Sequence, residues 1–197
     1  MARILQVFGG GNGSGKSTVA AYQKPPGHYV NADEIKVHLS CDDKTAALIA
    51  EQTRERLLEM NESFTMESVL STERNFNLMQ RAKGKGYHVC CIYMLTNNPE
   101  INKTRVAMRY QNGGHFVEPE TVERRYWNAM GLIPRLFEVC NECYIFDNST
   151  DRSLGGPSCI AVWANGVLEL FPSSIWPAEN LAALISGKYS RNHLQNS

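Results

Sequence analysis

A glycine-rich run carries the residue types that hold a nucleotide phosphate. Gly10 is followed by four positions and then by Gly15, Lys16 and Ser17, which is the spacing of the G-x-x-x-x-G-K-[ST] phosphate loop. Glycines let the backbone curl so that successive N–H groups converge on phosphate oxygens. Lys16 then reaches the outer phosphates, and the Ser17 hydroxyl ligates Mg²⁺. The residues that we assign to binding ATP or GTP are Gly10, Gly11, Asn12, Gly13, Ser14, Gly15, Lys16, Ser17 and Thr18, with Ser17 also assigned to the metal.

The alternative for this run is a turn that carries a lysine by chance. The residues before it, from Ile4 to Phe8, are apolar except for Gln6 and predict a buried strand. A helix is predicted from Lys16 to about Gln23, and its positive end points at the same anion. A phosphate loop requires a strand before it and a helix after it, so we predict that a nucleoside triphosphate binds here.

Two carboxylates follow further predicted strands. Asp33 comes after a short strand at 28–30 and opens a helix, and Glu67 follows a strand at 63–66. The carboxyl ends of strands are where α/β folds place ligand chemistry. We predict that Asp33 accepts or orients the proton of a substrate hydroxyl, with a helix N-cap as the alternative. Glu67, together with Ser68, either binds substrate hydroxyls or holds Mg²⁺ through water, and its alternative is a plain polar residue at a strand end.

Arg105 and Arg109 are four residues apart and therefore share one face of a predicted helix. Two guanidinium groups on a transferring phosphate would act as arginine fingers supplied by the chain itself. The alternative is a solvated helix face. We assign both residues to catalysis because this helix follows the most strand-like run of the chain, where small kinases place their lid. Of the neighbouring Arg124 and Arg125, we assign Arg124 to substrate binding and expect the other to pair with Glu120 or Glu123.

Strands and helices alternate along the chain, which predicts an α/β fold of the P-loop NTPase type, similar to nucleotide kinases. The sheet is expected to be parallel, with helices on both faces and an antiparallel hairpin at one edge, because Asn165-Gly166 joins two apolar runs. The run 87–95 should form the central strand. Strands are expected at 4–8, 28–30, 63–66, 87–95, 144–146, 159–164 and 167–171, and helices at 16–23, 43–61, 72–82, 98–112, from 119 on, and 177–184.

Length and charge limit the class of protein. The 197 residues fit one domain over 1–197, with a polar and frayed tail at 187–197. Lys and Arg balance Asp and Glu at 20 each, so no basic excess indicates a nucleic-acid partner. No apolar run approaches the ~18 residues that span a bilayer, and we expect a cytoplasmic protein with no membrane partner.

Cys140 and Cys143 form a C-x-x-C pair without a second pair at zinc spacing, so we interpret them as reduced thiols rather than metal ligands.

Five segments together resemble the zeta-toxin family of P-loop kinases in its compact form: GGNGSGKST, NADEI, ESVLST, RAKGKGYHV and RVAMRYQNGGHFVEPETVERRY. The resemblance covers roughly residues 3–150. It implies phosphorylation of a hydroxyl of a UDP-activated amino sugar, typically UDP-N-acetylglucosamine, with ATP or GTP and Mg²⁺. It also implies, for toxin–antitoxin pairs, a small helical antitoxin that blocks the nucleotide site.

The family's roles carry over position by position. Asp33 matches the catalytic base, Glu67 the substrate-binding acid, and Lys16 and Ser17 the phosphate and metal residues. Arg105 matches the first phosphate-stabilising arginine. Larger members place a second arginine after the lid helix, where this chain has Arg109 and His115, and we assign His115 to substrate binding.

Two other classes of function compete with a kinase. GGNGSGKST also resembles the loops of ABC-type and other motor ATPases, but the chain has no LSGGQ-like signature. The second competitor is a non-catalytic nucleotide-binding module whose lid has lost its function. Turnover that depends on an acceptor distinguishes the kinase from both.

Overall fold

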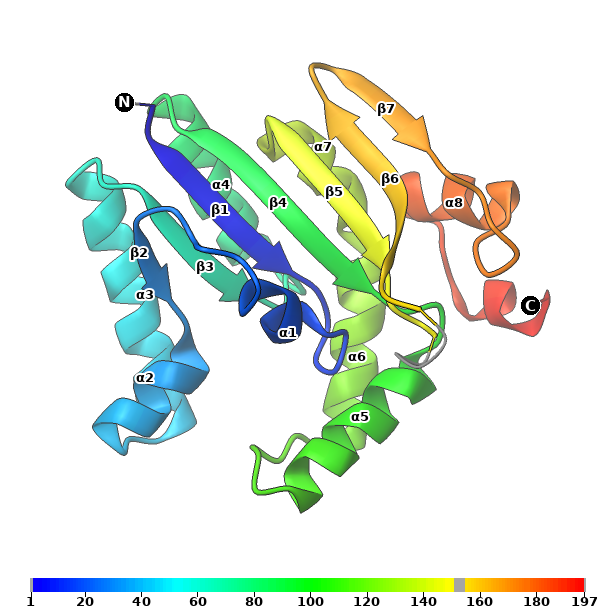
Figure 1. Cartoon of the computed structure of the whole chain (residues 1–197), viewed down its shortest axis with the longest axis horizontal. Helices are drawn as coiled ribbons and strands as arrows, with labels where there is room; N and C mark the ends of the chain where they lie inside the picture. Colours follow the sequence, from blue (N-terminus) through cyan, green and yellow to red (C-terminus); the bar gives the residue numbers. More distant parts are fainter. Residues whose placement is uncertain (1, 151–154, 197) are drawn as a thin grey trace.

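One mixed sheet organises the part of the chain that the structure describes. The computed structural model describes residues 2–150 and 155–196. In these residues seven strands lie in the order β2-β3-β1-β4-β5-β6-β7 (Figure 1). The strands are β1 Ile4–Gly9, β2 His28–Val30, β3 Phe64–Ser68, β4 His88–Leu95, β5 Glu142–Asp147, β6 Ser158–Ala164 and β7 Val167–Leu170.

The first five strands of the chain pair in parallel, and only the last two are antiparallel. β4 is the middle strand, between β1 and β5, as its long apolar run predicts. β6 and β7 form the expected edge hairpin through Asn165 and Gly166, whose φ angles of 53° and 76° are those of a tight two-residue turn. The predicted fold class is therefore confirmed.

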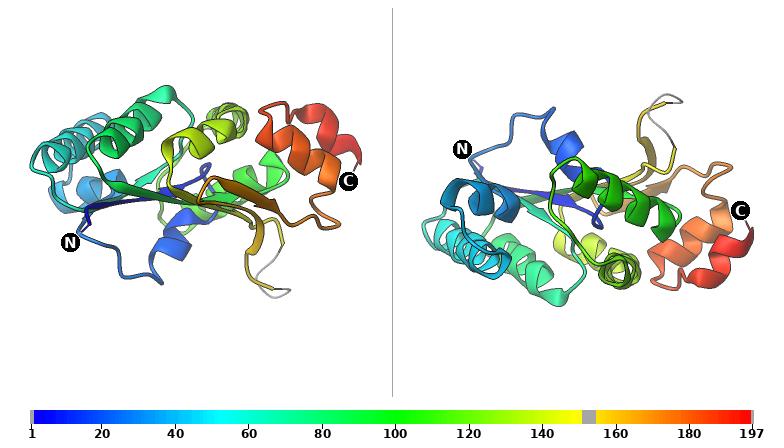
Figure 2. Two further views of the ribbon diagram at one scale, coloured as in Figure 1. Left: turned by 90° about the horizontal axis from the view of Figure 1, so that it is seen from above. Right: turned by 90° about the horizontal axis from the view of Figure 1, so that it is seen from below.

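Helices cover both faces of the sheet, but unequally. Figure 2 shows α3, α4, α7 and α8 on one face and α1 on the other. The larger apolar core lies under the four helices, while a small cluster of Phe8, Ala20, Ile92 and Met94 lies under α1. The helices are α1 Lys16–Ala20, α2 Ala32–Leu39, α3 Asp43–Glu59, α4 Glu73–Gly84, α5 Pro99–Gln111, α6 Pro119–Gly131, α7 Ile133–Val139 and α8 Ala178–Ile185, followed by the 3-10 helix η2 Arg191–Asn196.

Local signals in the sequence set where several helices begin. Asn31, Asp42 and Asn98 cap α2, α3 and α5, and each side chain accepts a hydrogen bond from a backbone N–H in the first turn. α5 also begins with Pro99. Proline has no backbone N–H, and this costs nothing in the first turn, where the N–H groups have no partner within the helix.

Several elements differ from the prediction. α1 ends at Ala20 rather than near Gln23, and β5 begins at Glu142 rather than at Tyr144. β3 continues through Ser68, so Glu67 lies within the strand rather than after it. α7 was not predicted, because seven residues between α6 and β5 are too few to show a helical period. Its buried residues Ile133, Leu136 and Val139 pack into the main core.

The residues just after α8, which lie in the expected tail at 187–197, pack against the core. The Tyr189 ring lies 5.2 Å from the Trp176 ring and 6.3 Å from the Trp127 ring, and its hydroxyl donates to the Asn97 carbonyl at 3.1 Å. Arg191 forms an ion pair with Glu123 on α6. Most residues of this segment are polar, so the sequence does not indicate that it packs. The Tyr189 side chain, which is only 6% exposed, holds the segment against the core.

Two further findings concern membrane-spanning helices and the thiols. Among the helices of the described residues, none combines the length and the apolarity needed to cross a bilayer. Cys140 and Cys143 are buried with Cys91 in the main core and form no disulfide.

Tyr189→Ala is expected to lower the free energy of unfolding by about 3 kcal/mol, because it removes a buried aromatic ring and its hydrogen bond. Urea denaturation followed by circular dichroism measures this change. Tyr22→Ala is the control, since Tyr22 is 85% exposed, and it should stay within about 0.5 kcal/mol of the wild type. Equal midpoints for the two variants would mean that the tail does not pack.

Candidate functional site

The candidate site lies at the carboxyl ends of the parallel strands. The phosphate loop follows β1, Asn31 follows β2, Glu67 lies near the end of β3, and Asn148 follows β5. Parallel strands bring their carboxyl ends to one edge of a sheet, so these residues lie at the same edge.

The phosphate loop has a shape that only glycine allows at two positions. Gly10 has a φ of 136°, and a Cβ there would lie 2.1 Å from the Met94 carbonyl oxygen. Gly15 is the N-cap residue of α1 and has a left-handed backbone conformation, with a φ of 99°. The α1 backbone therefore starts directly at Lys16, with its N–H groups toward the loop.

Side chains from other elements hold this loop from outside. Asn102 of α5 donates to the Asn12 carbonyl at 2.6 Å, and Asn148 donates to the Ser14 carbonyl at 2.8 Å. Asn102 is 1% exposed, so its hydrogen bond is shielded from water. Sequence reasoning missed both asparagines, because an amide at the start of a helix or after a strand is an ordinary capping residue.

Lys16 lies in a cavity of about 440 Å³ beside the loop, lined also by Thr18, Arg105, Arg109 and Asn148. Its ammonium group is 3.4 Å from the Gly11 carbonyl oxygen. Desolvation lowers the pKa of Lys16, while the carboxylates of Glu67 and Asp33 raise it. The structure therefore brings Lys16 close to both carboxylates that the sequence singled out.

Ser17 and Glu67 form a pair of oxygen donors next to the loop. The Ser17 hydroxyl donates to Glu67 Oε2 at 2.6 Å, and the Tyr29 hydroxyl donates to Glu67 Oε1. Burial and the Glu67 carboxylate raise the pKa of Tyr29, so Tyr29 stays a hydrogen-bond donor. Mg²⁺ is usually held by one or two such oxygens together with phosphate and water, and this donor set fits that ion. Within the described residues, no group of three or more His, Cys, Asp or Glu side chains could hold a metal by itself.

Asp33 is in the first turn of α2 but is not its cap. Asn31 is the N-cap, and its side chain accepts from the Asp33 backbone N–H at 2.9 Å. Asp33 lines a second cavity of about 690 Å³, which Lys16 and Glu67 also line. The capping alternative for Asp33 is therefore wrong, and its side chain stays available to a molecule in that cavity.

Arg105 and Arg109 share a helix face as predicted, but they differ in their contacts. Arg105 donates to the carbonyl oxygens of Asn148 at 2.8 Å and Thr150 at 3.3 Å, so it fixes the loop after β5. Arg109 lines both cavities, and its charge lowers the pKa of Lys16. Of the two, only Arg109 lines the larger cavity as well as the cavity beside the phosphate loop.

The structure places Arg125, and not Arg124, at the site. Arg125 lines the larger cavity, and its Nη1 donates to Asn12 Oδ1 of the phosphate loop at 3.3 Å. Arg124 is exposed, because successive residues of a helix point about 100° apart. The expected pairing of Arg125 with Glu120 or Glu123 was also wrong: among the described residues Arg125 forms no ion pair with either, and Glu123 pairs with Lys103 and Arg191.

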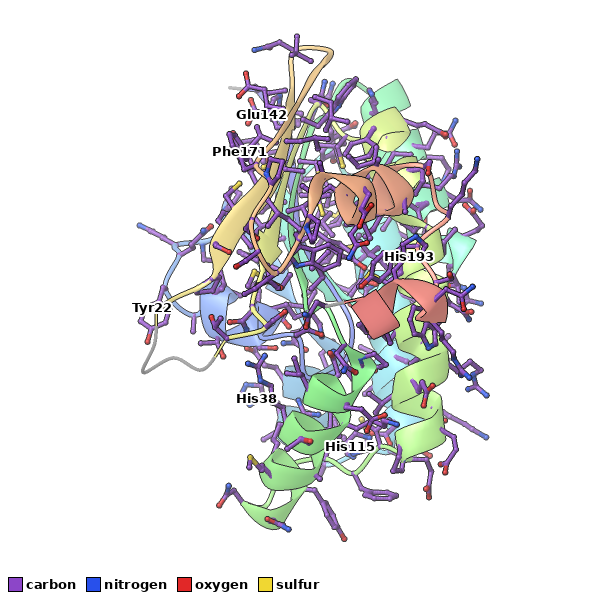
Figure 3. All side chains as sticks on the ribbon, turned by 90° about the vertical axis from the view of Figure 1, so that its right-hand side faces the viewer. Tyr22, His38, His115, Glu142, Phe171 and His193 are labelled. Carbon is purple, nitrogen blue, oxygen red and sulfur yellow. The ribbon has the colours of Figure 1, made fainter. Side chains whose placement is uncertain are left out.

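His115 closes one side of the larger cavity by a bridge between two parts of the chain. Its Nδ1 is 3.0 Å from Lys36 Nζ, and its Nε2 is 3.2 Å from Asp43 Oδ2. Lys36 also pairs with Asp43 at 2.8 Å. Figure 3 shows His115 at the α5 end of the molecule, the same end as His38. Both ring nitrogens have protein partners, so His115 connects the loop after α5 to α2 and α3 instead of offering a free nitrogen to a substrate.

Comparisons with known proteins agree on family and fold. A family model described as zeta toxin matches residues 28–153, more than half of the chain. An uncharacterized protein of Haemophilus influenzae is 32% identical in an alignment of 124 residues, which covers 59% of this chain and 88% of that protein.

Two solved structures share the fold. The AvrRxo1-ORF1:-ORF2 complex with ATP has a TM-score of 0.73 at 16% identity, covering 96% of this chain and 65% of that one. This chain thus spans slightly less than two thirds of the AvrRxo1 chain. The PezAT toxin–antitoxin system of Streptococcus pneumoniae has a TM-score of 0.58 at 18% identity, covering 98% of this chain and 82% of that one.

His115→Ala is expected to loosen the loop at 113–118 while leaving the global fold intact. Removing one partly exposed bridge costs up to about 1 kcal/mol, which corresponds to amide exchange up to about fivefold faster in that loop. Hydrogen–deuterium exchange with mass spectrometry measures this. His38→Ala, at an exposed position of α2, is the control. Unchanged exchange at 113–118 in His115→Ala would show that the bridge does not hold the loop.

Proposed function

The chain belongs to the zeta toxin family, and we propose that it is a kinase that transfers the γ-phosphate of ATP or GTP to a hydroxyl of a small molecule. One observation carries this proposal: two cavities meet at shared residues. Lys16 and Arg109 line both the cavity beside the phosphate loop and the larger cavity that contains Asp33. A donor phosphate in the first cavity and an acceptor hydroxyl in the second would meet at these two cations. We treat residues 1–197 as a single kinase domain.

In this proposal Asp33 receives the proton of the acceptor hydroxyl. An alcohol is a weak nucleophile, and a positioned carboxylate increases its reactivity by accepting that proton during attack. Asp33 lines the larger cavity, which we call the acceptor cavity. Its backbone N–H donates to the Asn31 side chain, and its carboxylate interacts electrostatically with Lys16. Lys16, Arg109 and Arg125 would then stabilise the charge of the migrating phosphoryl group.

Ser17 and Glu67 are the residues that we assign to Mg²⁺. The ion would neutralise charge on the bound phosphates, which is what a magnesium site supplies in phosphoryl transfer. Arg105 is assigned to the nucleotide side, where it holds the loop at 148–150 beside the phosphate-loop cavity. Glu67 also lines the acceptor cavity next to Ser68, so both remain candidates for contact with the acceptor.

The family resemblance supplies the acceptor and the partner that we propose. UDP-N-acetylglucosamine is the first acceptor to test. A small helical antitoxin is the proposed protein partner. One solved relative is titled a toxin–antitoxin system and another is a two-protein complex, which supports looking for such a partner.

Asp33→Asn is expected to lower acceptor-dependent phosphate transfer by about 10²- to 10⁴-fold, because the amide cannot accept the hydroxyl proton. Transfer of labelled γ-phosphate to UDP-N-acetylglucosamine, and to a metabolite extract, measures this. Nucleotide affinity should not change. Transfer by Asp33→Asn at the wild-type rate would contradict the proposal. ATP hydrolysis that needs dimerisation but no acceptor would favour a motor ATPase. Nucleotide binding without any turnover would favour a non-catalytic module.

Arg125→Met and Arg124→Met form a matched pair on α6. Arg125→Met should slow transfer by about 10²-fold or more, because it removes a cation beside the phosphate loop. Arg124→Met should remain within about twofold of the wild type, since its side chain points to solvent. The rate of transfer under saturating nucleotide tests both, and the reverse order of effects would mean that the assignment of Arg125 is wrong.

A further inference from the structure

Glu67 lies on the face of the sheet that α1 covers. In the parallel pairing of β1 with β3, Phe8 is opposite Glu67, and Phe8 packs under α1 in one apolar cluster with Ala20. Residues that pair directly on neighbouring strands point to the same face of a sheet. The Glu67 side chain therefore lies on the side of α1, where the Ser17 hydroxyl donates to its Oε2 at 2.6 Å.

Tyr29 of the edge strand β2 contacts the other oxygen of the same carboxylate. Tyr29 pairs with Thr65, two residues before Glu67 in β3, so the side chains of Tyr29 and Glu67 point to the same face as diagonal neighbours. The Tyr29 hydroxyl donates to Glu67 Oε1. Each oxygen of the Glu67 carboxylate is thus bound by a hydroxyl group, one from the phosphate loop and one from β2.

Further hydrogen bonds connect Tyr29 to α2. Asn31 Nδ2 donates to the Tyr29 hydroxyl oxygen in a long hydrogen bond of 3.5 Å, and Asn31 Oδ1 accepts from the Asp33 backbone N–H at 2.9 Å. A continuous series of hydrogen bonds therefore joins Ser17, Glu67, Tyr29, Asn31 and Asp33. It connects the two residues that we assign to Mg²⁺ with the residue that we assign to the acceptor hydroxyl.

Tyr29 can act on a bound ligand only through Glu67. It is not among the described residues that line the phosphate-loop cavity or the acceptor cavity, whereas Ser17 lines the first and Glu67 the second. Burial and the hydrogen bond to Glu67 raise the pKa of Tyr29, so its hydroxyl keeps the proton that it donates. A carboxylate held at Oε1 cannot turn its Oε2 away from Ser17. The Ser17 proton is then directed to Glu67, which leaves the lone pairs of the Ser17 oxygen to a metal ion.

We propose that Tyr29 is a positioning residue for Mg²⁺, because its hydroxyl holds Glu67 in the orientation in which Ser17 and Glu67 together bind the ion. This inference rests on the proposed kinase function, which assigns these two residues to Mg²⁺. A tyrosine that only attached the edge strand β2 to β3 would contribute to stability, and its loss would leave the contribution of the metal to nucleotide binding unchanged. Metal-dependent binding therefore distinguishes the two roles.

The contribution of the metal can be measured without any phosphate transfer. A non-hydrolysable ATP analogue is titrated into the full chain by calorimetry, once with saturating Mg²⁺ and once with EDTA. The ratio of the two affinities, which we call the magnesium ratio, gives the contribution of the ion. Tyr29→Phe is expected to lower the magnesium ratio about tenfold, as is typical when a group that orients a metal ligand is removed. The affinity in EDTA should stay that of the wild type.

Tyr144→Phe is the matched control. The Tyr144 hydroxyl also donates to a glutamate of the sheet, Glu142 Oε2 at 3.0 Å, but neither residue lines either of the two cavities. This variant should keep the wild-type magnesium ratio. A double variant tests whether Tyr29 acts through Glu67: in a Glu67→Gln background, Tyr29→Phe should change the ratio by less than about twofold. Thermal unfolding checks that every variant is folded.

A magnesium ratio of Tyr29→Phe within about twofold of the wild type would overturn the proposal, as would an equal loss in Tyr144→Phe. A loss that persists in the Glu67→Gln background, or a wild-type affinity that does not depend on Mg²⁺, would overturn it as well. Because the readout is binding, a wild-type protein that transfers no phosphate would refute the kinase function, while the titrations still decide the role of Tyr29. If transfer is observed, excess Mg²⁺ should restore the rate of Tyr29→Phe, since only the affinity for the ion is weakened.

Discussion

A phosphate loop can bind a nucleotide only if its N–H groups point inward. That orientation requires the carbonyl oxygens of the loop to point outward and to accept hydrogen bonds there. Asn102 and Asn148 bind two of these carbonyls from outside the loop. Asn102 is itself held by the Thr96 hydroxyl, and the Thr96 carbonyl accepts from the buried Tyr126 hydroxyl at 2.7 Å. A chain of hydrogen bonds therefore runs from α6 to the loop. Because these groups are buried, each bond is costly to break, and the loop is preorganised.

α5 and α6 are attached to the phosphate loop by side chains of their own. α5 supplies Asn102 to the loop and Arg109 to both cavities, and α6 supplies Arg125. At its far end, the loop after α5 is attached to α2 and α3 by His115. The helix that carries Arg105 and Arg109 is thus fixed at both ends, which keeps these two guanidinium groups beside the phosphate loop.

The larger cavity is lined by charges of both signs. Lys16, Arg109 and Arg125 line it together with the carboxylates of Asp33 and Glu67, and Arg74 lines it in the first turn of α4. Carboxylates accept hydrogen bonds from hydroxyl groups, whereas the cations attract anionic groups.

The sequence by itself determined the phosphate loop, the alternation of strands and helices and the edge hairpin, because these depend on glycine, on apolar periodicity and on turn residues close together in the chain. It also singled out Asp33 and Glu67, since residues at strand ends share one edge of a parallel sheet. Only the tertiary structure decided between Arg124 and Arg125, which differ by about 100° on one helix. It alone revealed Asn102, the bridge of His115 and the packing of Tyr189. Each of these depends on contacts between residues far apart in the chain, and no local pattern records such contacts.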